Sequence, residues 1–155
     1  MPTKITTELI KELRDATGIS VMQCKHALIE AKGDMKKALA ILKKTSSNIA
    51  LKKVDRLLGS GYIHAYVHGE GKIGAMVELL CETDFVAKNE VFKVLAKEIA
   101  MQIAATDPKD IQALLQEPFI KNGEINIISL VEEAIQKTGE RIEIGRYARF
   151  ELSKK

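Results

Sequence analysis

The feature that most constrains the fold of this chain is a change of hydrophobic period at Tyr62. From there to residue 82, side chains alternate in character at every second position, which is the pattern of β-strands and not of helices. The run Gly69-Glu70-Gly71-Lys72 interrupts the alternation, and its two glycines favour a turn. We therefore predict a β-hairpin with strands at residues 62–68 and 73–82.

Helical spacing dominates on both sides of this hairpin. Residues 1–45 contain three short segments with helical spacing, separated by residues that start or stop helices, namely Thr6, Gly18, Ser20 with Gln23, and Gly33-Asp34. Helices this short are marginally stable alone, so they are expected to pack together as a three-helix bundle. A longer helix is predicted over residues 89–105, whose apolar positions follow the helical repeat: Phe92, Leu95, Ala96, Ile99 and Ile103.

The C-terminal third is predicted to add two helices and one more strand. A short helix is expected at 109–116, and a second around 130–135 that ends at Gly139. Residues 141–152 alternate again, with one face toward a core and one toward water, although Arg146 falls on the apolar side and suggests a bulge or the edge of the core. The fold class is thus α+β, an N-terminal helical bundle followed by a small core with a mainly antiparallel sheet packed by helices.

The chain divides by charge as well as by period. Residues 1–56 carry 12 Lys and Arg against 6 Asp and Glu, whereas residues 57–155 carry 12 against 15. We predict a bundle at residues 1–45, a linker at 46–61 and an α+β core at 62–155. The lysines of the bundle have no aromatic residues among them for base stacking, so a solvated helix face is favoured over a nucleic-acid-binding face.

Composition and spacing argue against several classes of protein. No apolar stretch approaches the roughly 18 residues of a membrane span, no secretory signal is visible, and the two cysteines show no paired spacing, so a cytoplasmic protein with reduced thiols is expected. The Gly71-Lys72 pair lacks the other residues of a phosphate-binding loop. His64 and His68 would lie about 13 Å apart on a strand, too far to share a metal ion. No metal, cofactor or catalytic residue is predicted, and Cys81 is interpreted as a buried, inert thiol.

The segment Thr83-Asp84-Phe85-Val86 stands at the join between the second strand and the long helix. Phe85, Phe92 and Ile99 are spaced by seven, so one unbroken helix would bury Phe85 in the core. Asn89 followed by Glu90 is instead a good helix start, which would leave Phe85 on a separate turn where it can point outward. The spacing alone leaves both interpretations open.

Three segments of this chain resemble bacterial elongation factor Ts. They are residues 13–42, with the pattern Thr-Gly-x-x-x-Met-x-Cys-Lys-x-Ala-Leu-x-Glu-Ala-x-Gly-Asp, residues 72–105, which contain Thr83-Asp84-Phe85-Val86, and residues 117–152. The resemblance implies a bundle like a ubiquitin-associated domain. It also implies a guanine-nucleotide exchange factor for elongation factor Tu, which binds Tu in its GDP-bound and nucleotide-free forms and makes or breaks no covalent bond, so it is not an enzyme in that sense.

The resemblance also implies roles for individual residues. Thr83, Asp84, Phe85 and Val86 would enter elongation factor Tu near its magnesium and phosphate site, with Phe85 as a wedge and Asp84 disturbing the magnesium ion. Arg14, Val21 and Met22 would form a second contact with the same partner, although Val21 and Met22 suit a core equally well.

The chain departs from the family pattern in its length. Family members usually carry a long, mostly helical segment where only about a dozen residues lie here, between Ala105 and Pro118, and longer members duplicate the core. This raises a homodimer as a way to restore a second core. Two other functions stay open, a module that binds elongation factor Tu or another protein without exchange activity, and a nucleic-acid-binding protein that uses the basic bundle.

Overall fold

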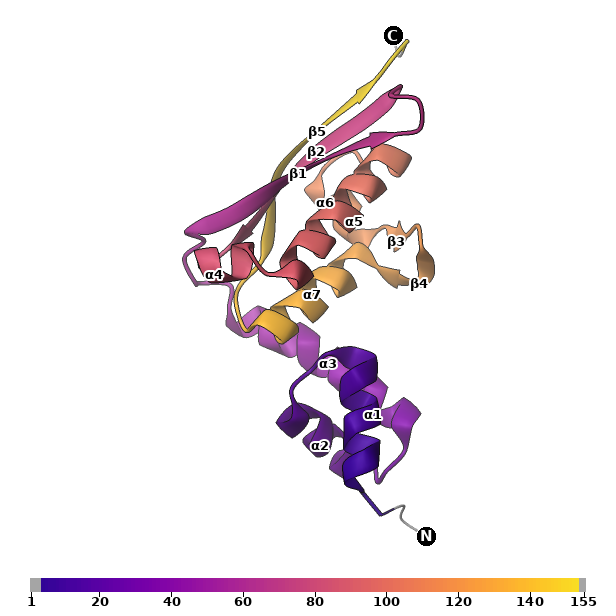
Figure 1. Ribbon diagram of the computed structural model, residues 1–155, viewed down its shortest axis with the longest axis vertical. Helices are drawn as coiled ribbons and strands as arrows, with labels where there is room; N and C mark the ends of the chain where they lie inside the picture. The colour runs from indigo at the N-terminus through magenta and orange to yellow at the C-terminus, as the bar shows by residue number, and fades with distance from the viewer. Residues whose placement is uncertain (1–3, 154–155) are drawn as a thin grey trace.

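The computed structural model describes residues 4–153. Its helical head lies at one end of an elongated molecule and its α+β core at the other (Figure 1). The head consists of α1 (Thr7–Thr17), α2 (Val21–Glu30) and α3 (Met35–Lys52). Each helix starts at a side-chain cap: Thr6 accepts a hydrogen bond from the backbone N–H of Leu9, Ser20 from that of Gln23, and Asp34 from that of Lys37. The structure thus confirms the three predicted helices of the bundle and the residues predicted to start them.

The head has its own apolar core, separate from that of the α+β part. Its buried members come from all three helices and the turns between them: Leu13, Ile19, Cys24, Ala27, Leu28, Ala31, Ala38 and Leu42. Four of them, Cys24, Ala27, Leu28 and the C-cap residue Ala31, follow the helical repeat along α2. A core of eight small and medium side chains is modest, which suits a bundle that also packs against a neighbour.

The third helix is longer than predicted. α3 continues through the serines that we took as the start of a linker and ends at Lys52, so the linker predicted at residues 46–61 begins with about two turns of helix. The serines fit because their hydroxyl groups are used: Ser46 bonds to Leu42 O and to Gln136 Oε1, and Ser47 donates to Glu132 Oε2 at 2.7 Å. α3 thus belongs to the head and also packs on α7, and the division of the chain at residues 45 and 61 stays a prediction.

The core is a three-stranded antiparallel sheet with its helices on one face (Figure 1). β2 (Ile73–Cys81) lies between β1 (Ser60–His68) and β5 (Glu143–Glu151), as the predicted hairpin and C-terminal strand require. α5 (Glu90–Thr106) packs on the inner face, where Ala75, Val77, Leu79 and Cys81 of β2 are buried against helix positions that include Phe92, Ile99 and Ile103. Both the α+β class and the antiparallel sheet are confirmed.

One expectation about β5 is wrong. We predicted that the apolar positions 148, 150 and 152 would face the core, but Phe150 is 78% exposed and Leu152 is 68% exposed. The register of β5 shifts beside Glu78 of β2, since Val77 pairs with Tyr147 and Leu79 with Ile144. This bulge reverses the parity of the strand, as the position of Arg146 had suggested.

The bulge turns two polar side chains toward the helices, and both find partners there. Tyr147 donates a hydrogen bond to Pro108 O at 2.7 Å. The guanidinium group of Arg149 donates to Ala104 O at the end of α5, at 3.1 and 3.0 Å. The apolar side chains of β5 after the bulge consequently lie on the outer face of the sheet.

The segment between α5 and α7 is compact. It contains α6 (Ile111–Gln116) and a small hairpin that the sequence analysis did not predict, β3 (Pro118–Phe119) with β4 (Asn122–Asn126), before α7 (Ile127–Thr138). Gln102, fully buried on α5, fixes this segment: its amide donates to Glu117 Oε2 and Pro118 O, each at 3.0 Å, and accepts from Ile120 N at 2.9 Å. The short connection is thus hydrogen-bonded to the long helix at its far end.

Within residues 4–153, no helix combines the length and the apolar composition that crossing a membrane requires.

Candidate functional site

The structure separates Thr83-Asp84-Phe85-Val86 from the long helix. α4 (Asp84–Ala87) is a single turn with its own cap, Thr83, whose hydroxyl accepts a hydrogen bond from Val86 N. α5 has a second cap, Asn89, whose carboxamide oxygen accepts from Val91 N at 2.9 Å. A new helix therefore begins after α4, and the alternative of one unbroken helix from Phe85 to Ile99 is wrong.

Phe85 points away from the protein. Its exposed fraction is 81%, whereas Val86 and Ala87 beside it are buried at 3% and 8%. Val86 and Ala87 belong to the apolar core under the sheet and hold α4 against it. The turn therefore presents a large aromatic side chain to solvent on a firmly packed base, an arrangement that costs hydrophobic free energy in the isolated protein.

Asp84 lies beside Phe85 at the start of α4 and is also exposed. Ser60, at the start of β1, donates a hydrogen bond to Asp84 Oδ1 at 2.5 Å. Since the carboxylate opens α4, it also interacts favourably with the free N–H groups there. Of the four residues of this segment, the structure thus exposes Thr83, Asp84 and Phe85 and buries Val86.

Several residues around this turn were not singled out by the sequence analysis. Glu140, at the start of the connection between α7 and β5, accepts hydrogen bonds from the backbone N–H groups of Glu82 and Thr83 and from the Thr83 hydroxyl. Arg56 donates to Glu82 Oε1 at 3.5 Å and to Gly139 O at 3.3 Å. These residues are far apart in the chain and have no spacing in common, so a single sequence offers no signal for them.

Cys81 supports the turn from below. Its sulfur is buried and donates a hydrogen bond to Thr83 O at 3.2 Å. Burial raises the pKa of the Cys81 thiol above its ordinary value, and the nearby Glu140 carboxylate raises it further. A thiol held in its protonated form is a poor nucleophile, which agrees with the interpretation of Cys81 as inert.

Arg14, Val21 and Met22 are all exposed in the head, so none of them belongs to its core. Val21 and Met22 open α2, and Arg14 lies in the last turn of α1. They lie apart from α4, because α1 and α2 belong to the head and α4 to the core (Figure 1).

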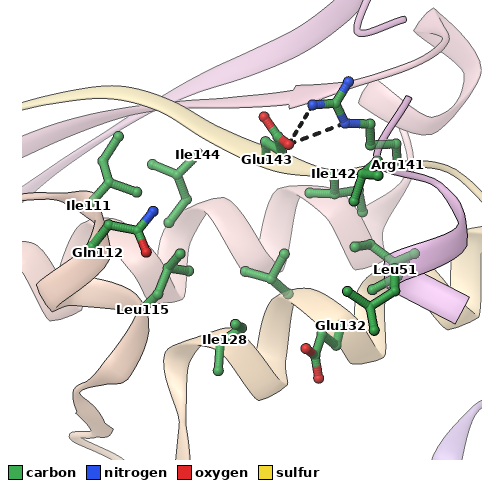
Figure 2. A pocket seen from close by; sticks show the side chains of 14 residues that line it. Leu51, Ile111, Gln112, Leu115, Ile128, Glu132, Arg141, Ile142, Glu143 and Ile144 are labelled. Atoms are coloured by element: carbon green, nitrogen blue, oxygen red, sulfur yellow. Dashed lines mark hydrogen bonds and ion pairs between the residues drawn. The ribbon is translucent and has the colours of Figure 1, made fainter. Parts of the chain in front are cut away.

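An apolar hollow lies away from α4. It has a volume of about 440 Å³ and lies between the end of α3, α6, α7 and the start of β5. Figure 2 shows its walls, which include Leu51, Leu115 and Ile142, with the Arg141–Glu143 ion pair at its rim. Its lining carries no His, Cys or Lys, and its polar members are Gln112, Glu132, Arg141 and Glu143.

Comparison with known proteins assigns this chain to a family. The family model described as elongation factor TS matches residues 82–155. The protein named elongation factor Ts from Carboxydothermus hydrogenoformans is 39% identical, over 96% of this chain and 89% of its own. The chain belongs to the elongation factor Ts family.

Two other relatives show how chain length varies in the elongation factor Ts family. The protein from Heliobacterium modesticaldum is 36% identical over 96% of this chain and 90% of its own, whereas that from Nostoc sp. is 37% identical over 98% of this chain but only 48% of its own. The alignment with the Carboxydothermus protein covers 193 positions against 155 residues here, so that relative has at least 38 residues without a counterpart in this chain. This is in line with the shortening inferred from the sequence.

The raised pKa of Cys81 predicts a pH effect on stability. A pKa that is higher in the folded state means that the folded protein binds this proton more tightly, so the stabilisation is complete below the unfolded thiol pKa of about 8.5 and is lost as pH rises through the folded pKa. Cys81→Ser keeps a donor for Thr83 O without titrating in this range. Urea unfolding should show a steeper fall in the free energy of unfolding with pH for the parent than for this variant. Parallel curves above pH 8.5 would contradict the assignment.

Proposed function

We propose that this chain is a guanine-nucleotide exchange factor for elongation factor Tu and promotes GDP release from it in the cytoplasm, the compartment of bacterial translation. The exposed Phe85 on its packed turn, in a chain of this family, is the observation that carries the proposal. The factor changes no covalent bond. It acts by binding the nucleotide-free GTPase more tightly than the GDP-bound form, which by linkage weakens GDP binding by the same factor.

Phe85 is the wedge in this proposal. Aromatic residues are the usual anchors of protein interfaces, because they bury much apolar surface with few rotatable bonds. A side chain that is 81% exposed has almost all of that surface still to bury. The free energy of burying it against a distorted nucleotide site would favour the distorted state, which is how a binding protein accelerates release.

Asp84 acts on the magnesium ion in the same proposal. GDP is held in GTPases partly by Mg²⁺, which neutralises phosphate charge. A carboxylate presented next to the wedge would compete with the existing oxygen ligands for that ion. Ser60 holds Asp84 Oδ1, which leaves the second carboxylate oxygen for the partner.

Phe85→Ala should separate exchange from folding. The free energy of unfolding is expected to change by about 0.5 kcal/mol or less, because the side chain is exposed, whereas a core Phe would cost about 3–5 kcal/mol. GDP release from elongation factor Tu, followed with fluorescent GDP, should slow by about 30-fold or more, the usual effect of removing an interface anchor. Ile120→Ala, at an exposed apolar residue on the β3–β4 hairpin, is the matched control and should exchange normally.

This assay also tests the alternative of a binding module. A parent chain that binds elongation factor Tu but leaves GDP release at its spontaneous rate would refute the exchange function, and a Phe85→Ala chain that works at the parent rate would refute the wedge.

Asp84→Ala should slow exchange in a magnesium-dependent way. If the carboxylate weakens the hold of Mg²⁺, the defect is expected to be largest at millimolar Mg²⁺ and to shrink when Mg²⁺ is chelated. If Asp84 only stabilises the start of α4, the change would cost about 0.3–1 kcal/mol of stability, and the rate ratio of variant to parent would not vary with Mg²⁺. Release rates across a magnesium titration, with Asp84→Asn as the isosteric comparison, distinguish the two.

We also propose that Arg14, Val21 and Met22 form the second contact with elongation factor Tu, through a head of the ubiquitin-associated type. Their support is exposure: the adjacent apolar side chains of Val21 and Met22 are 48% and 59% exposed and can still be buried against a partner. Met22→Asp should weaken binding to nucleotide-free elongation factor Tu in calorimetry by about tenfold, with little change in melting temperature. Leu39→Asp, at an exposed apolar position on α3, serves as the control.

The outer face of the sheet supports a homodimer as part of this proposal. Ile63, Val67, Met76 and Phe150 are each half or more exposed, and they form one apolar surface across all three strands. Such a face is normally covered in a sheet protein, and a second copy offers an identical apolar partner for two-fold packing of sheet on sheet.

Met76→Glu should make such a dimer dissociate. Met76 pairs with Ala65 on one side and Ala148 on the other, so its side chain is at the centre of the face, where an unpaired carboxylate cannot be buried. Sedimentation should show a dimer for the parent and a monomer for the variant, while Ile120→Glu stays dimeric. A parent chain that sediments as a monomer at tens of micromolar would exclude the dimer.

A further inference from the structure

The turn that carries Phe85 is held by one carboxylate from a distant part of the chain. Glu140 Oε1 accepts hydrogen bonds from Glu82 N at 3.1 Å and Thr83 N at 3.0 Å, and its Oε2 accepts from the Thr83 hydroxyl at 2.6 Å. Both oxygens of one side chain are thus used on two consecutive residues. Hydrogen bonds to an ionised group are about twice as strong as neutral ones, so this carboxylate is a strong local constraint.

Glu140 binds the backbone N–H groups that follow the last residue of β2. Cys81, the last residue of β2, pairs with Ser60, and the next two backbone N–H groups have left the β1–β2 ladder. Without Glu140 these groups would have to be hydrated, and the chain after Cys81 could take many conformations. The carboxylate fixes the path of the backbone at the point where it leaves the strand.

Thr83 connects Glu140 to α4 through two hydrogen bonds of its hydroxyl group. Its hydroxyl group has one proton, which it gives to Glu140, and a lone pair that accepts from Val86 N, the bond that caps α4. Thr83 can serve both partners only in one side-chain orientation, and Glu140 selects it. Because Phe85 is the second residue of α4 and has little protein around it, its direction depends on the backbone of this turn.

Other contacts place Glu140 itself. It follows Gly139, which ends α7 in the left-handed conformation with φ of 76°. Arg56 binds Gly139 O and Glu82 Oε1, and Arg141 donates to Arg56 O at 2.5 Å. The segments that contain Arg56, Glu82 and Glu140 therefore form one hydrogen-bonded unit under the turn.

We propose that Glu140 is a positioning residue for nucleotide exchange, which presents Phe85 in a fixed direction through Thr83. The inference rests on the proposed function of Phe85 as the wedge. An anchor that is already ordered loses less conformational entropy on binding, so a fixed Phe85 gives more of its burial free energy to the complex. Glu140 touches neither nucleotide nor magnesium in this role.

The first test is the exchange rate of Glu140→Ala and Glu140→Gln in the full chain, with fluorescent GDP on elongation factor Tu. Glu140→Ala removes all three hydrogen bonds, and the second-order rate constant of exchange should fall about tenfold. Glu140→Gln keeps a carbonyl oxygen for the two N–H groups and an amide that can donate to the Thr83 hydroxyl, so it should recover most of that loss. A Gln variant as slow as the Ala variant would overturn the positioning role.

The decisive test combines Glu140→Ala with Phe85→Ala. If Glu140 acts through the wedge, its substitution should have almost no effect on exchange once Phe85 is gone, so the two changes are strongly non-additive. If Glu140 only stabilises the fold, or contacts the partner elsewhere, the two losses multiply, and the inference is wrong. Should Glu140→Ala fail to fold, Thr83→Val removes the shared hydroxyl from the other side and takes its place in the same cycle.

Controls separate the failure of this inference from that of the proposed function. Glu133→Ala removes a carboxylate of α7 that pairs with Lys137 at 3.0 Å and not with the turn, and it should exchange at the parent rate. A slow Phe85→Ala with Glu140→Ala at the parent rate would overturn only the role of Glu140. A Phe85→Ala chain at the parent rate would remove the wedge, and this inference with it.

Discussion

The packing of Phe92 under the sheet is the interaction on which the rest of the core depends. Phe92 is fully buried against the inner face and lies in the first turn of α5, so it fixes where the long helix begins. Asn89 can cap the helix only if that start is kept, and the residues before it must then form their own turn. Because Phe92 is buried at the start of α5, α4 forms a separate turn before it. On that turn Phe85 is exposed.

Polar contacts join the two parts of the molecule, together with Ile49 and Ala50 of α3 packed on the core, whereas separate apolar clusters define each part. Gln136 on α7 is 6% exposed and accepts a hydrogen bond from Ser46 of α3, while its amide donates to Gln23 of α2 at 2.6 Å. A buried amide bonded to a half-buried one orients the parts specifically, because a shifted arrangement would leave the buried donors and acceptors unsatisfied. The surface with Val21 and Met22 and the turn with Phe85 are therefore held in one relative position, as a partner that contacts both would require.

Local patterns in the sequence were sufficient to predict the three strands of the main sheet, the starts of the three head helices and of α5, and the α+β class, since caps and hydrophobic period depend on neighbours in the chain. The exposure of Phe85 could not be decided that way, because the spacing from Phe85 to Phe92 fits one helix as well as two. The inward position of Tyr147 and Arg149 depends on a bulge whose place is set by the partner strand. The serines at 46 and 47 suggested a linker, and only their hydrogen bonds to α7 explain why the helix continues. The Glu140 contacts connect residues about 57 positions apart in the chain, so no local pattern reports them.

The continuity of α3 has a geometric consequence for how this chain can vary. Its 18 residues span about 27 Å, with the first half in the head and the last turns against α7. Each residue inserted or deleted along a helix advances it by about 1.5 Å and turns it by about 100°. A change of a single residue in the middle of α3 would therefore rotate the head to a different side of the core, whereas the loops on either side can absorb length changes without such a rotation. The number of residues in α3 therefore sets both the distance and the angle between the head and the core.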